Sequence, residues 1–137
     1  MLLVETCLAP SPLEGLGVYA SQFIPEGTLV WVLDPAVDIV LSETQLLERP
    51  HVYRQFMQRH AYFDRTLGGY LLDGDNARFL NHHAEPNLRF REDGNGVAAR
   101  DIAPGEEIVC DYGEFMPEVV LLPGRMLVAS EDAMMRA

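Results

Sequence analysis

Short apolar runs, each ended within a few residues by proline or glycine, are the feature that most restricts how this chain can fold. Residues 18–23 and 28–33 are such runs, and β-branched and aromatic side chains fill them. Pro and Gly punctuate the chain between the runs, as they do between β-strands. The first third of the sequence therefore predicts short strands joined by turns.

A helical insert is predicted at about 42–62. Ser42 and Gln45 have the spacing of a capping box, in which each side chain bonds the other's backbone N–H, so a short helix should start there. Beyond Pro50, apolar or aromatic side chains recur at steps of three and four and predict an amphipathic helix ending near Tyr62. They are Val52, Tyr53, Phe56, Met57 and His60.

The second half returns to the strand pattern. Gly68-Gly69 is a plausible hairpin turn, residues 77–80 have the character of a helical turn, and residues 88–91 and 97–100 flank a turn at 93–96. Residues 23–30 and 101–109 share one design, two strands joined by a turn with isoleucine, proline and glycine, although two such segments do not establish a repeat. Together these patterns predict an α+β fold that is mainly β.

Size and composition favour one compact domain. The chain has 137 residues, is 48% hydrophobic and has a mean hydropathy of 0.00, which suits a single core and leaves no room for a second folded unit. No run of eighteen apolar residues is present, and the first residues lack the pattern of a signal peptide. We expect an intracellular protein with no membrane contact, cytoplasmic if bacterial and nuclear as an option if eukaryotic.

The charge balance is strongly acidic, with 10 basic against 21 acidic residues and a net charge of -11. Such a field repels phosphate backbones, so we expect no direct nucleic-acid binding. It attracts cationic partners, such as a lysine-rich tail or a basic ribosomal or chromosomal protein. The charge taken alone is better explained as an acidic surface that keeps the protein soluble.

Cysteine and histidine give little support for a metal. Cys7 and Cys110 are too few for a disulfide framework and lie in no zinc-type spacing, so we expect buried thiols, with Cys110 alternatively in a pocket wall. His82 and His83 are adjacent and point in different directions, so a metal site combining them with His51 or His60 is a minor alternative.

Three short motifs stand out, and each has an ordinary structural explanation when taken alone. Gly15-Leu16-Gly17 suits a tight turn, Asn81-His82 within residues 76–87 suits a turn, and Asp111-Tyr112 suits a tyrosine at a strand end. In this order and spacing, however, they resemble the sequence marks of the SET domain, a fold that uses S-adenosylmethionine to methylate protein lysines. The resemblance covers about residues 12–116.

The resemblance implies a SET-domain, β-clip-like fold of several short twisted sheets with a helical insert and a C-terminal pseudoknot. It divides the chain into a SET domain at 1–116 and a C-terminal segment or tail at 117–137. In this family the C-terminal segment threads through a loop, which brings the Asn-His and Asp-Tyr strings side by side. Two copies of the chain could pair as a homodimer and so complete a groove, and the sequence leaves this open.

The resemblance also assigns site residues. Tyr112 is implied as the catalytic tyrosine, and Asn81 and His82 are implied to hold the amino and adenine groups of the cofactor. The full cofactor-binding set is Leu16, Gly17, Tyr70, Arg78, Phe79, Asn81, His82 and Tyr112, with Arg78 and Phe79 mainly structural. The substrate channel is assigned to Tyr62, Cys110 and Phe115, with Tyr70 as a further candidate for its wall, although Tyr62 and Tyr70 could equally be core residues. Cys110 stands where family members tend to have Phe or Tyr, and its small size weakly favours more than one added methyl.

Two departures from the family pattern concern zinc. His83 and Ala84 stand where the family often has Ser and Cys, and that Cys joins a zinc cluster. The resemblance therefore implies no such zinc here, so a different segment must close the lysine channel. Residues 112–115 followed by 116–120 are the available candidate.

The expected chemistry is an in-line methyl transfer that needs alignment and a neutral lysine, because the reference pKa of lysine is about 10.4. An apolar channel disfavours the ammonium form, and Tyr112 can orient the amine without being a strong base. We expect a protein-lysine N-methyltransferase that uses S-adenosylmethionine on a basic protein such as a histone. The alternatives are a non-catalytic SET-like module that binds a basic peptide and, well below it, a metal-dependent hydrolase using the histidines and Asp111.

Overall fold

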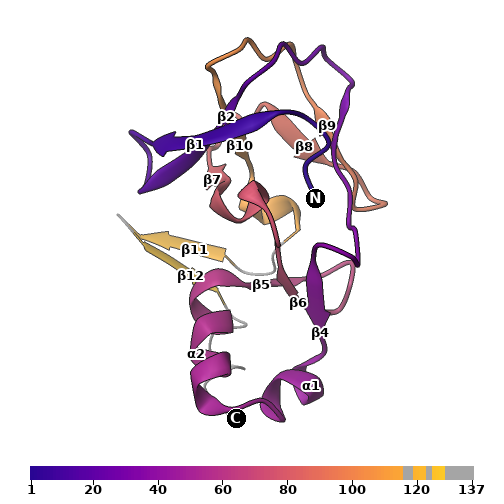
Figure 1. Cartoon of the computed structure of the whole chain (residues 1–137), viewed down its shortest axis with the longest axis vertical. Helices are drawn as coiled ribbons and strands as arrows, with labels where there is room; N and C mark the ends of the chain where they lie inside the picture. Colours follow the sequence, from indigo (N-terminus) through magenta and orange to yellow (C-terminus); the bar gives the residue numbers. More distant parts are fainter. Residues whose placement is uncertain (116–118, 123–124, 129–137) are drawn as a thin grey trace.

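The computed structural model describes residues 1–115, 119–122 and 125–128, and short strands predominate in it (Figure 1). The strands are β1 (Thr6–Pro10), β2 (Leu16–Ala20), β3 (Leu29–Trp31), β4 (Ile39–Leu41), β5 (Tyr62–Asp64), β6 (Gly69–Leu72), β7 (Asn81–His82), β8 (Leu88–Phe90), β9 (Gly96–Ala98), β10 (Glu107–Cys110), β11 (Val119–Leu122) and β12 (Arg125–Val128). The helices are α1 (Glu43–Leu47) and α2 (His51–His60), with 3-10 turns η1 (Asn76–Phe79) and η2 (Tyr112–Glu114). The prediction of a mainly-β α+β fold is confirmed.

The strands form three sheets. The largest has the order β1-β2-β10-β8-β9-β3, and β7 also pairs with β10. A smaller sheet has the order β4-β6-β5, and β11 pairs with β12 in an antiparallel hairpin. Figure 1 shows the largest sheet at one end of the molecule and α1 and α2 at the other, with the β4-β6-β5 sheet between them.

Strand β10 is the element that organises the functional half of the chain. It runs antiparallel to β2 and parallel to β7 and β8, with Val109 opposite Asn81 and Cys110 opposite His82. The backbone N–H of His83 also donates to the carbonyl of Cys110 at 2.9 Å. The Asn-His and Asp-Tyr strings therefore lie side by side although about thirty residues separate them, as predicted.

The two turn segments with the shared design pair with each other. Ile24 and Ile102 form an isolated antiparallel bridge, each backbone N–H donating to the other's carbonyl at 2.9 and 2.8 Å. Both side chains are fully buried. The two segments are thus similar in sequence because each forms one side of the same antiparallel bridge.

Asn87 ties β8 to β10 through its side chain. It is fully buried; its amide nitrogen donates to the carbonyl of Glu107 at 2.8 Å, and its amide oxygen accepts from the backbone N–H of Val109, also at 2.8 Å. The side chain thus offers β10 the donor and acceptor that a neighbouring strand would offer. Asn87 fixes the strand that leads into Tyr112.

The helical insert matches its predicted start and end. Ser42 caps α1, with Ser42 and Gln45 forming both bonds of a capping box at 2.9 and 3.1 Å. The amphipathic interpretation of α2 is correct only in part, because Met57 is the one residue of α2 that is fully buried. Val52 and Phe56 are 75% and 41% exposed, since the helix contacts the small sheet along a narrow stripe.

The β5-β6 hairpin differs slightly from its prediction. Residues 65–68 form the turn, where Gly68 has a φ of +64° that favours glycine. Gly69 instead begins β6 and is buried, and a Cβ there would lie 2.8 Å from the carbonyl oxygen of Leu41 on β4. Asp64 stabilises the turn by accepting from the N–H groups of Thr66 and Leu67.

Two hydrophobic clusters form the core. One lies against the largest sheet and includes Val18, Leu88 and Ile108, and the other joins Met57 and Tyr70 under the helices. Cys110 is buried as expected, but the same prediction for Cys7 is wrong, because β1 lies at the sheet edge and exposes it. Among the described residues, none of the helices has the length and apolar character needed to cross a bilayer.

The C-terminal predictions concern residues that are only partly described. Residues 112–115 form η2 and its cap, and β11 and β12 follow as a hairpin. Residues 116–118, which belong to the segment proposed to close the channel, lie outside the described residues, as do residues 123–124 and 129–137 of the segment or tail predicted at 117–137.

Candidate active site

A cavity of about 210 Å³ lies where β5, η1, β10 and η2 meet. Of the residues predicted for the site, Tyr62, Arg78, Phe79, Cys110, Tyr112 and Phe115 line it. The remaining lining residues are Trp31, Arg59, His60, Ala61, Asp73, Ala77, Leu80 and Phe90. Six aromatic side chains from distant parts of the sequence, together with the imidazole of His60, therefore line one space.

Tyr112 is fixed on the wall of this cavity. Its hydroxyl donates to the backbone carbonyl of Leu80, the residue immediately before Asn81, and its backbone N–H donates to Nδ1 of His82 at 3.0 Å. Desolvation, with Cys110 and other nearby groups adding to it, raises the pKa of the Tyr112 phenol above its usual range. Tyr112 is therefore a neutral hydroxyl near pH 7 and not a strong base.

Phe115 packs at the centre of the aromatic lining. Its ring centroid lies 5.0 Å from that of Tyr62, 4.9 Å from that of Phe90 and 5.9 Å from that of Tyr112. The rings are tilted or edge-on, which are favourable arrangements for aromatic pairs. The backbone carbonyl of Phe115 accepts from the N–H of Arg65, which ties η2 to the β5-β6 turn.

Asn81 joins the first motif to the second. Its side-chain nitrogen donates to the carbonyls of Glu14 and Leu16 at 3.1 and 3.2 Å and to the carboxylate of Glu107 at 3.0 Å. All three partners are acceptors, so the assignment of nitrogen to this position is unambiguous. Among the described residues, the side chain of Asn81 makes its hydrogen bonds through the nitrogen alone. Its side-chain oxygen therefore remains able to accept a hydrogen bond.

Gly17 is required by the same polar cluster. A Cβ at this position would lie 2.4 Å from the carboxylate of Glu107, which also accepts from the Ser11 hydroxyl at 2.9 Å. Gly17 is buried at the start of β2, whereas the side chain of Leu16 is 44% exposed. The early glycine motif, Asn81 and β10 therefore converge, as the resemblance predicted. Glu107 was not singled out from the sequence.

The predicted site residues that do not line the cavity are Leu16, Gly17, Asn81, His82 and Tyr70, and Tyr70 is the one among them in the second core cluster. It does not line the cavity, and its side chain packs in the second core cluster with Leu41, Leu46 and Met57. Its ring lies edge-on to Phe63 at 5.3 Å. Strand alternation explains the difference, because Tyr70 faces the helices while Asp73, three residues later, faces the cavity.

Asp73 lines the cavity, although it was not singled out from the sequence. It follows β6 directly, is buried, and accepts from Trp31 Nε1 at 3.2 Å and from the Tyr62 hydroxyl at 3.5 Å. Burial, with the neighbouring Asp38 carboxylate adding to it, raises the pKa of Asp73 to about 7. An aspartate directly after an apolar strand was the available sequence signal.

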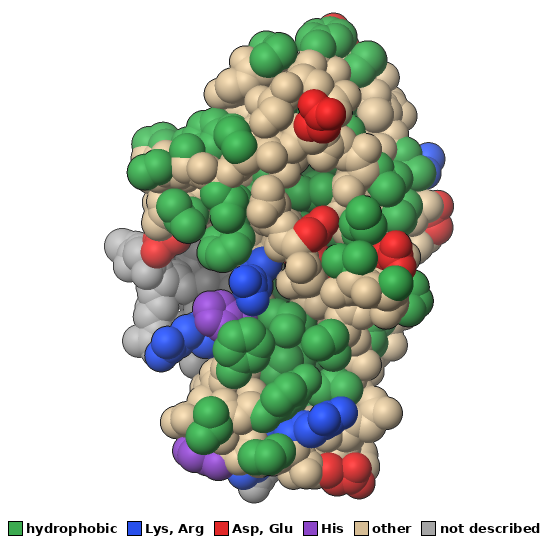
Figure 2. Space-filling view, in the orientation of Figure 1, with side chains coloured by type: hydrophobic (Ala, Val, Ile, Leu, Met, Phe, Trp, Pro, Cys, Tyr) green, Lys and Arg blue, Asp and Glu red, His purple; other side chains and the backbone are tan. Residues whose placement is uncertain are grey.

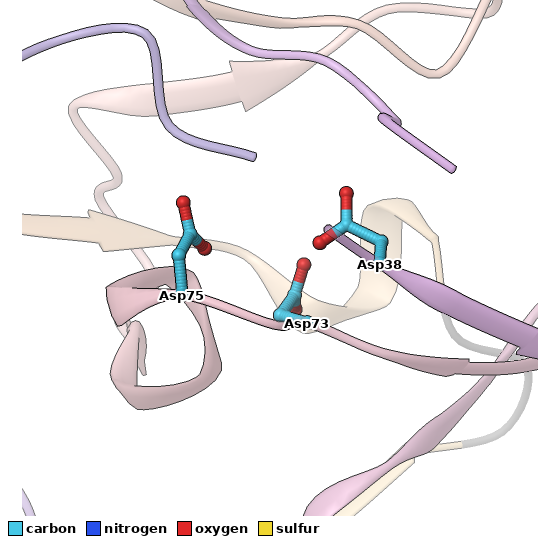
Figure 3. A group of neighbouring side chains, drawn as sticks. All are labelled: Asp38, Asp73 and Asp75. Atoms are coloured by element: carbon cyan, nitrogen blue, oxygen red, sulfur yellow. The ribbon is translucent and has the colours of Figure 1, made fainter. Parts of the chain in front are cut away.

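Asp38, Asp73 and Asp75 direct their carboxylates into one space (Figure 3). Within the described part of the chain they are the one group of three side chains placed to share a metal, and no histidine is among them. Each of their six oxygens accepts from a protein donor, among them the Met1 ammonium on Asp38 and the Leu2 N–H on Asp75. The group is a satisfied hydrogen-bond network, and it gives no support to the metal-dependent hydrolase alternative.

Arg59, His60 and Arg78 line the cavity on the side of α2 and η1. Burial and the charges of Arg78 and Arg59 lower the pKa of His60, so His60 is neutral near pH 7. Figure 2 shows arginine and histidine side chains grouped beside an apolar area in the middle of this face. The arginines are exposed, and the guanidinium of Arg78 lies 5.2 Å from the centre of the Phe79 ring.

The family model described as "SET domain" matches residues 15–113. The chain belongs to the SET domain family. Residues 15–113 hold all three motifs, the helical insert and every residue that lines the cavity except Phe115.

Among curated proteins, this SET domain is 30% identical over 110 residues to the histone-lysine N-methyltransferase Set2 of Drosophila melanogaster, covering 72% of this chain and 5% of that protein. It is 32% identical over 125 residues to the histone-lysine N-methyltransferase SETMAR of Mus musculus, covering 77% of this chain and 40% of that protein. The chain thus spans less than half the length of these relatives.

Solved structures confirm the fold of this SET domain. Chaetomium thermophilum Polycomb Repressive Complex 2 bound to GSK126 matches with a TM-score of 0.59 and 21% identity, covering 91% of this chain and 20% of that chain. A structure of ctPRC2 in an autoinhibited conformation bound to S-adenosylmethionine matches with a TM-score of 0.58 and 23% identity, covering 82% and 16%.

Proposed function

We propose that this SET domain is a protein-lysine N-methyltransferase that uses S-adenosylmethionine and acts on a basic protein. The observation that carries the proposal is the position of Tyr112, a neutral phenol held on the cavity wall through the carbonyl of Leu80. That bond places the predicted catalytic hydroxyl one residue from Asn81, the predicted cofactor ligand. The printed activities of the relatives support the same reaction.

The cavity itself suits the amine substrate better than the complete cofactor. Its volume of about 210 Å³ is below the roughly 300–1,000 Å³ of pockets that enclose drug-sized ligands, and a lysine side chain is smaller than such ligands. Its walls are mainly aromatic, which disfavours the ammonium form of lysine and favours the neutral amine. We assign it to the substrate channel, with Tyr62, Cys110 and Phe115 in its wall.

The cofactor is assigned to Asn81, His82, Leu16 and Gly17. Asn81 fits this role because its nitrogen is committed to three protein acceptors, so its oxygen is left to accept from an ammonium group. Gly17 fits it because the backbone there carries no side chain and is held close to Glu107. When bound, S-adenosylmethionine supplies a methyl group on a sulfonium.

The protein's own contribution is then orientation and desolvation. The Tyr112 hydroxyl donates its hydrogen to Leu80, so its oxygen lone pairs are available to an incoming amine or to the polarised methyl hydrogens. The phenol of Tyr112 stays protonated near pH 7, so it does not take the proton of the lysine ammonium. The lysine must therefore lose that proton to another acceptor before methyl transfer. The net charge of -11 favours the approach of a basic protein such as a histone.

The test is transfer of labelled methyl groups to histones and ribosomal proteins. All ten basic residues of the chain are arginines, so label cannot enter a lysine side chain of the enzyme itself. Tyr112→Phe should lower transfer at least a hundredfold, within the roughly 10²–10³ range for lost transition-state donors. Tyr19→Phe is the matched control, because the exposed Tyr19 hydroxyl also donates to a backbone carbonyl, that of Pro10 at 2.9 Å.

Three outcomes are informative. Loss of transfer in Tyr112→Phe and in Asn81→Ala, with Tyr19→Phe unchanged, supports the proposal. Cofactor binding without transfer to any basic protein selects the non-catalytic binding module instead. Transfer that survives both site substitutions shows that the site is assigned wrongly.

A further inference from the structure

A chain of three side chains runs along one wall of the cavity. Trp31 Nε1 donates to Oδ1 of Asp73 at 3.2 Å, and the Tyr62 hydroxyl donates to Oδ2 of the same carboxylate at 3.5 Å. All three residues line the cavity, and they come from β3, from the end of β6 and from β5. Asp73 therefore lies beside Tyr62 in the cavity wall and is hydrogen-bonded to its hydroxyl.

The two oxygens of Asp73 have different partners, and this difference is important. Indole N–H is a donor only, so Trp31 can be satisfied only if Oδ1 remains an acceptor. The hydroxyl of Tyr62 can donate or accept. A proton on Asp73 must therefore reside on Oδ2, where it faces Tyr62.

The charged surroundings of Asp73 favour such a proton. Asp38 on the neighbouring loop accepts from the Met1 ammonium at 2.9 Å, whereas the donors to Asp73 are neutral. The titratable groups that act on Asp73 or are affected by it are Met1, Asp38, Tyr62, Asp75, Cys110 and Tyr112. Burial is the largest cause of the raised pKa of about 7, followed by the Asp38 carboxylate. Both forms of Asp73 are thus populated at neutral pH.

We propose that Asp73 is a positioning residue that sets the direction of the Tyr62 hydroxyl and so makes binding of the substrate amine depend on pH. This inference rests on the proposed function, because it takes the cavity as the amine channel. With Asp73 ionised, Tyr62 gives its hydrogen to Oδ2 and turns oxygen lone pairs to the cavity. With Asp73 protonated, Oδ2 donates to Tyr62, and the Tyr62 hydrogen turns toward the cavity and opposes the N–H groups of an amine.

A first experiment tests the ionisation without any activity. Trp31 is the single tryptophan of the chain and bonds Asp73 directly, so its fluorescence should titrate between pH 5 and 9 with a midpoint near 7. Asp73→Asn should abolish the transition. His60→Gln is the matched control for a titrating neighbour and should retain it, with far-UV circular dichroism verifying the fold at each pH.

A second experiment tests the coupling to the substrate. With a lysine peptide, KM should fall about fivefold between pH 6 and 7 and about tenfold between pH 6 and 8, and level off above pH 8, while kcat at saturating peptide follows lysine deprotonation alone. Asp73→Asn should remove the change in KM but leave the dependence of kcat on pH. Binding of n-butylamine, followed through Trp31 and expressed per concentration of neutral amine, should likewise lose its pH dependence in Asp73→Asn.

The outcomes separate this inference from the proposed function. A Trp31 transition that persists in Asp73→Asn, or a KM profile that Asp73→Asn leaves unchanged, overturns the role of Asp73 even if methyl transfer is found. Butylamine binding that follows the Trp31 transition, in a protein without transferase activity, supports the role of Asp73 and contradicts the proposed function.

Discussion

Asn87 provides the sharpest test of how this fold positions its site. Replacing it with alanine removes the partners of the Val109 N–H and the Glu107 carbonyl, which Asn87 bonds at 2.8 Å each. A buried polar group left unsatisfied costs about 1–3 kcal/mol, so two such groups give about 2–6 kcal/mol. That loss is a large part of the roughly 5–15 kcal/mol by which domains are stable. Asn87→Ala should therefore be strongly destabilised in urea unfolding followed by circular dichroism.

Asn87→Asp separates the two bonds. The aspartate keeps an acceptor for the Val109 N–H, but when ionised it has no hydrogen for the Glu107 carbonyl and places a charge in the core. Acidification restores that hydrogen, so the stability of Asn87→Asp relative to the native chain should rise from pH 8 to pH 5. The control is Asn95→Ala in the β8-β9 turn, where the amide bonds Asp93 at 3.5 Å, with an expected loss under about 1 kcal/mol. A loss under about 1 kcal/mol for Asn87→Ala would refute the reasoning.

Three further predictions concern the site and the insert. Gly17→Ala should displace Glu107 and weaken its bond to Asn81, raising the dissociation constant for S-adenosylmethionine about tenfold by calorimetry; unchanged affinity would contradict the polar cluster. Ser42→Ala should lower the free energy of unfolding by about 1 kcal/mol through loss of the capping box, whereas no loss would mean that α1 needs no cap. The folded pKa of Asp73 lies above its unfolded value, so its contribution to stability is fully present below pH 3.8 and is lost as pH rises to about 7. The stability of Asp73→Asn relative to the native chain should rise across that window by about 4 kcal/mol in urea unfolding, and a flat difference would contradict the raised pKa.

Local patterns were sufficient for most of the elements. The capping box at Ser42, the periodicity before Tyr62 and the turn after Phe90 each depend on neighbours within a few residues. Such interactions are encoded in consecutive side chains, so the sequence predicts them directly. Val52 and Phe56 show the limit of this reasoning, because a helical repeat does not reveal how wide a stripe another element covers.

The site was predicted in its motifs but not in its supporting groups. Tyr112, Asn81 and Gly17 belong to recognisable strings, and the structure brings them together through β10. Glu107 and Asp73 were missed because a single acidic residue has no local signature. Glu107 bonds Asn81 and Asp73 bonds Trp31, each more than twenty residues away, and Asp73 also bonds Tyr62, 11 residues away. Tyr70 was assigned to the site by the resemblance, and its position along the chain does not reveal which face of β6 it occupies.

The order of residues by itself determined where strands, turns and helices form in this chain, and it located the three motifs of the SET domain. Only the tertiary structure decided that β10 pairs with β7 and β8, that Asn87 completes its hydrogen bonds, and that Asp73 lies beside Tyr62. The physical reason is the distance along the chain over which the interactions act, because backbone conformation is set by adjacent residues. Burial, the pKa of a carboxyl group and the direction of a hydroxyl depend on every element that packs around them.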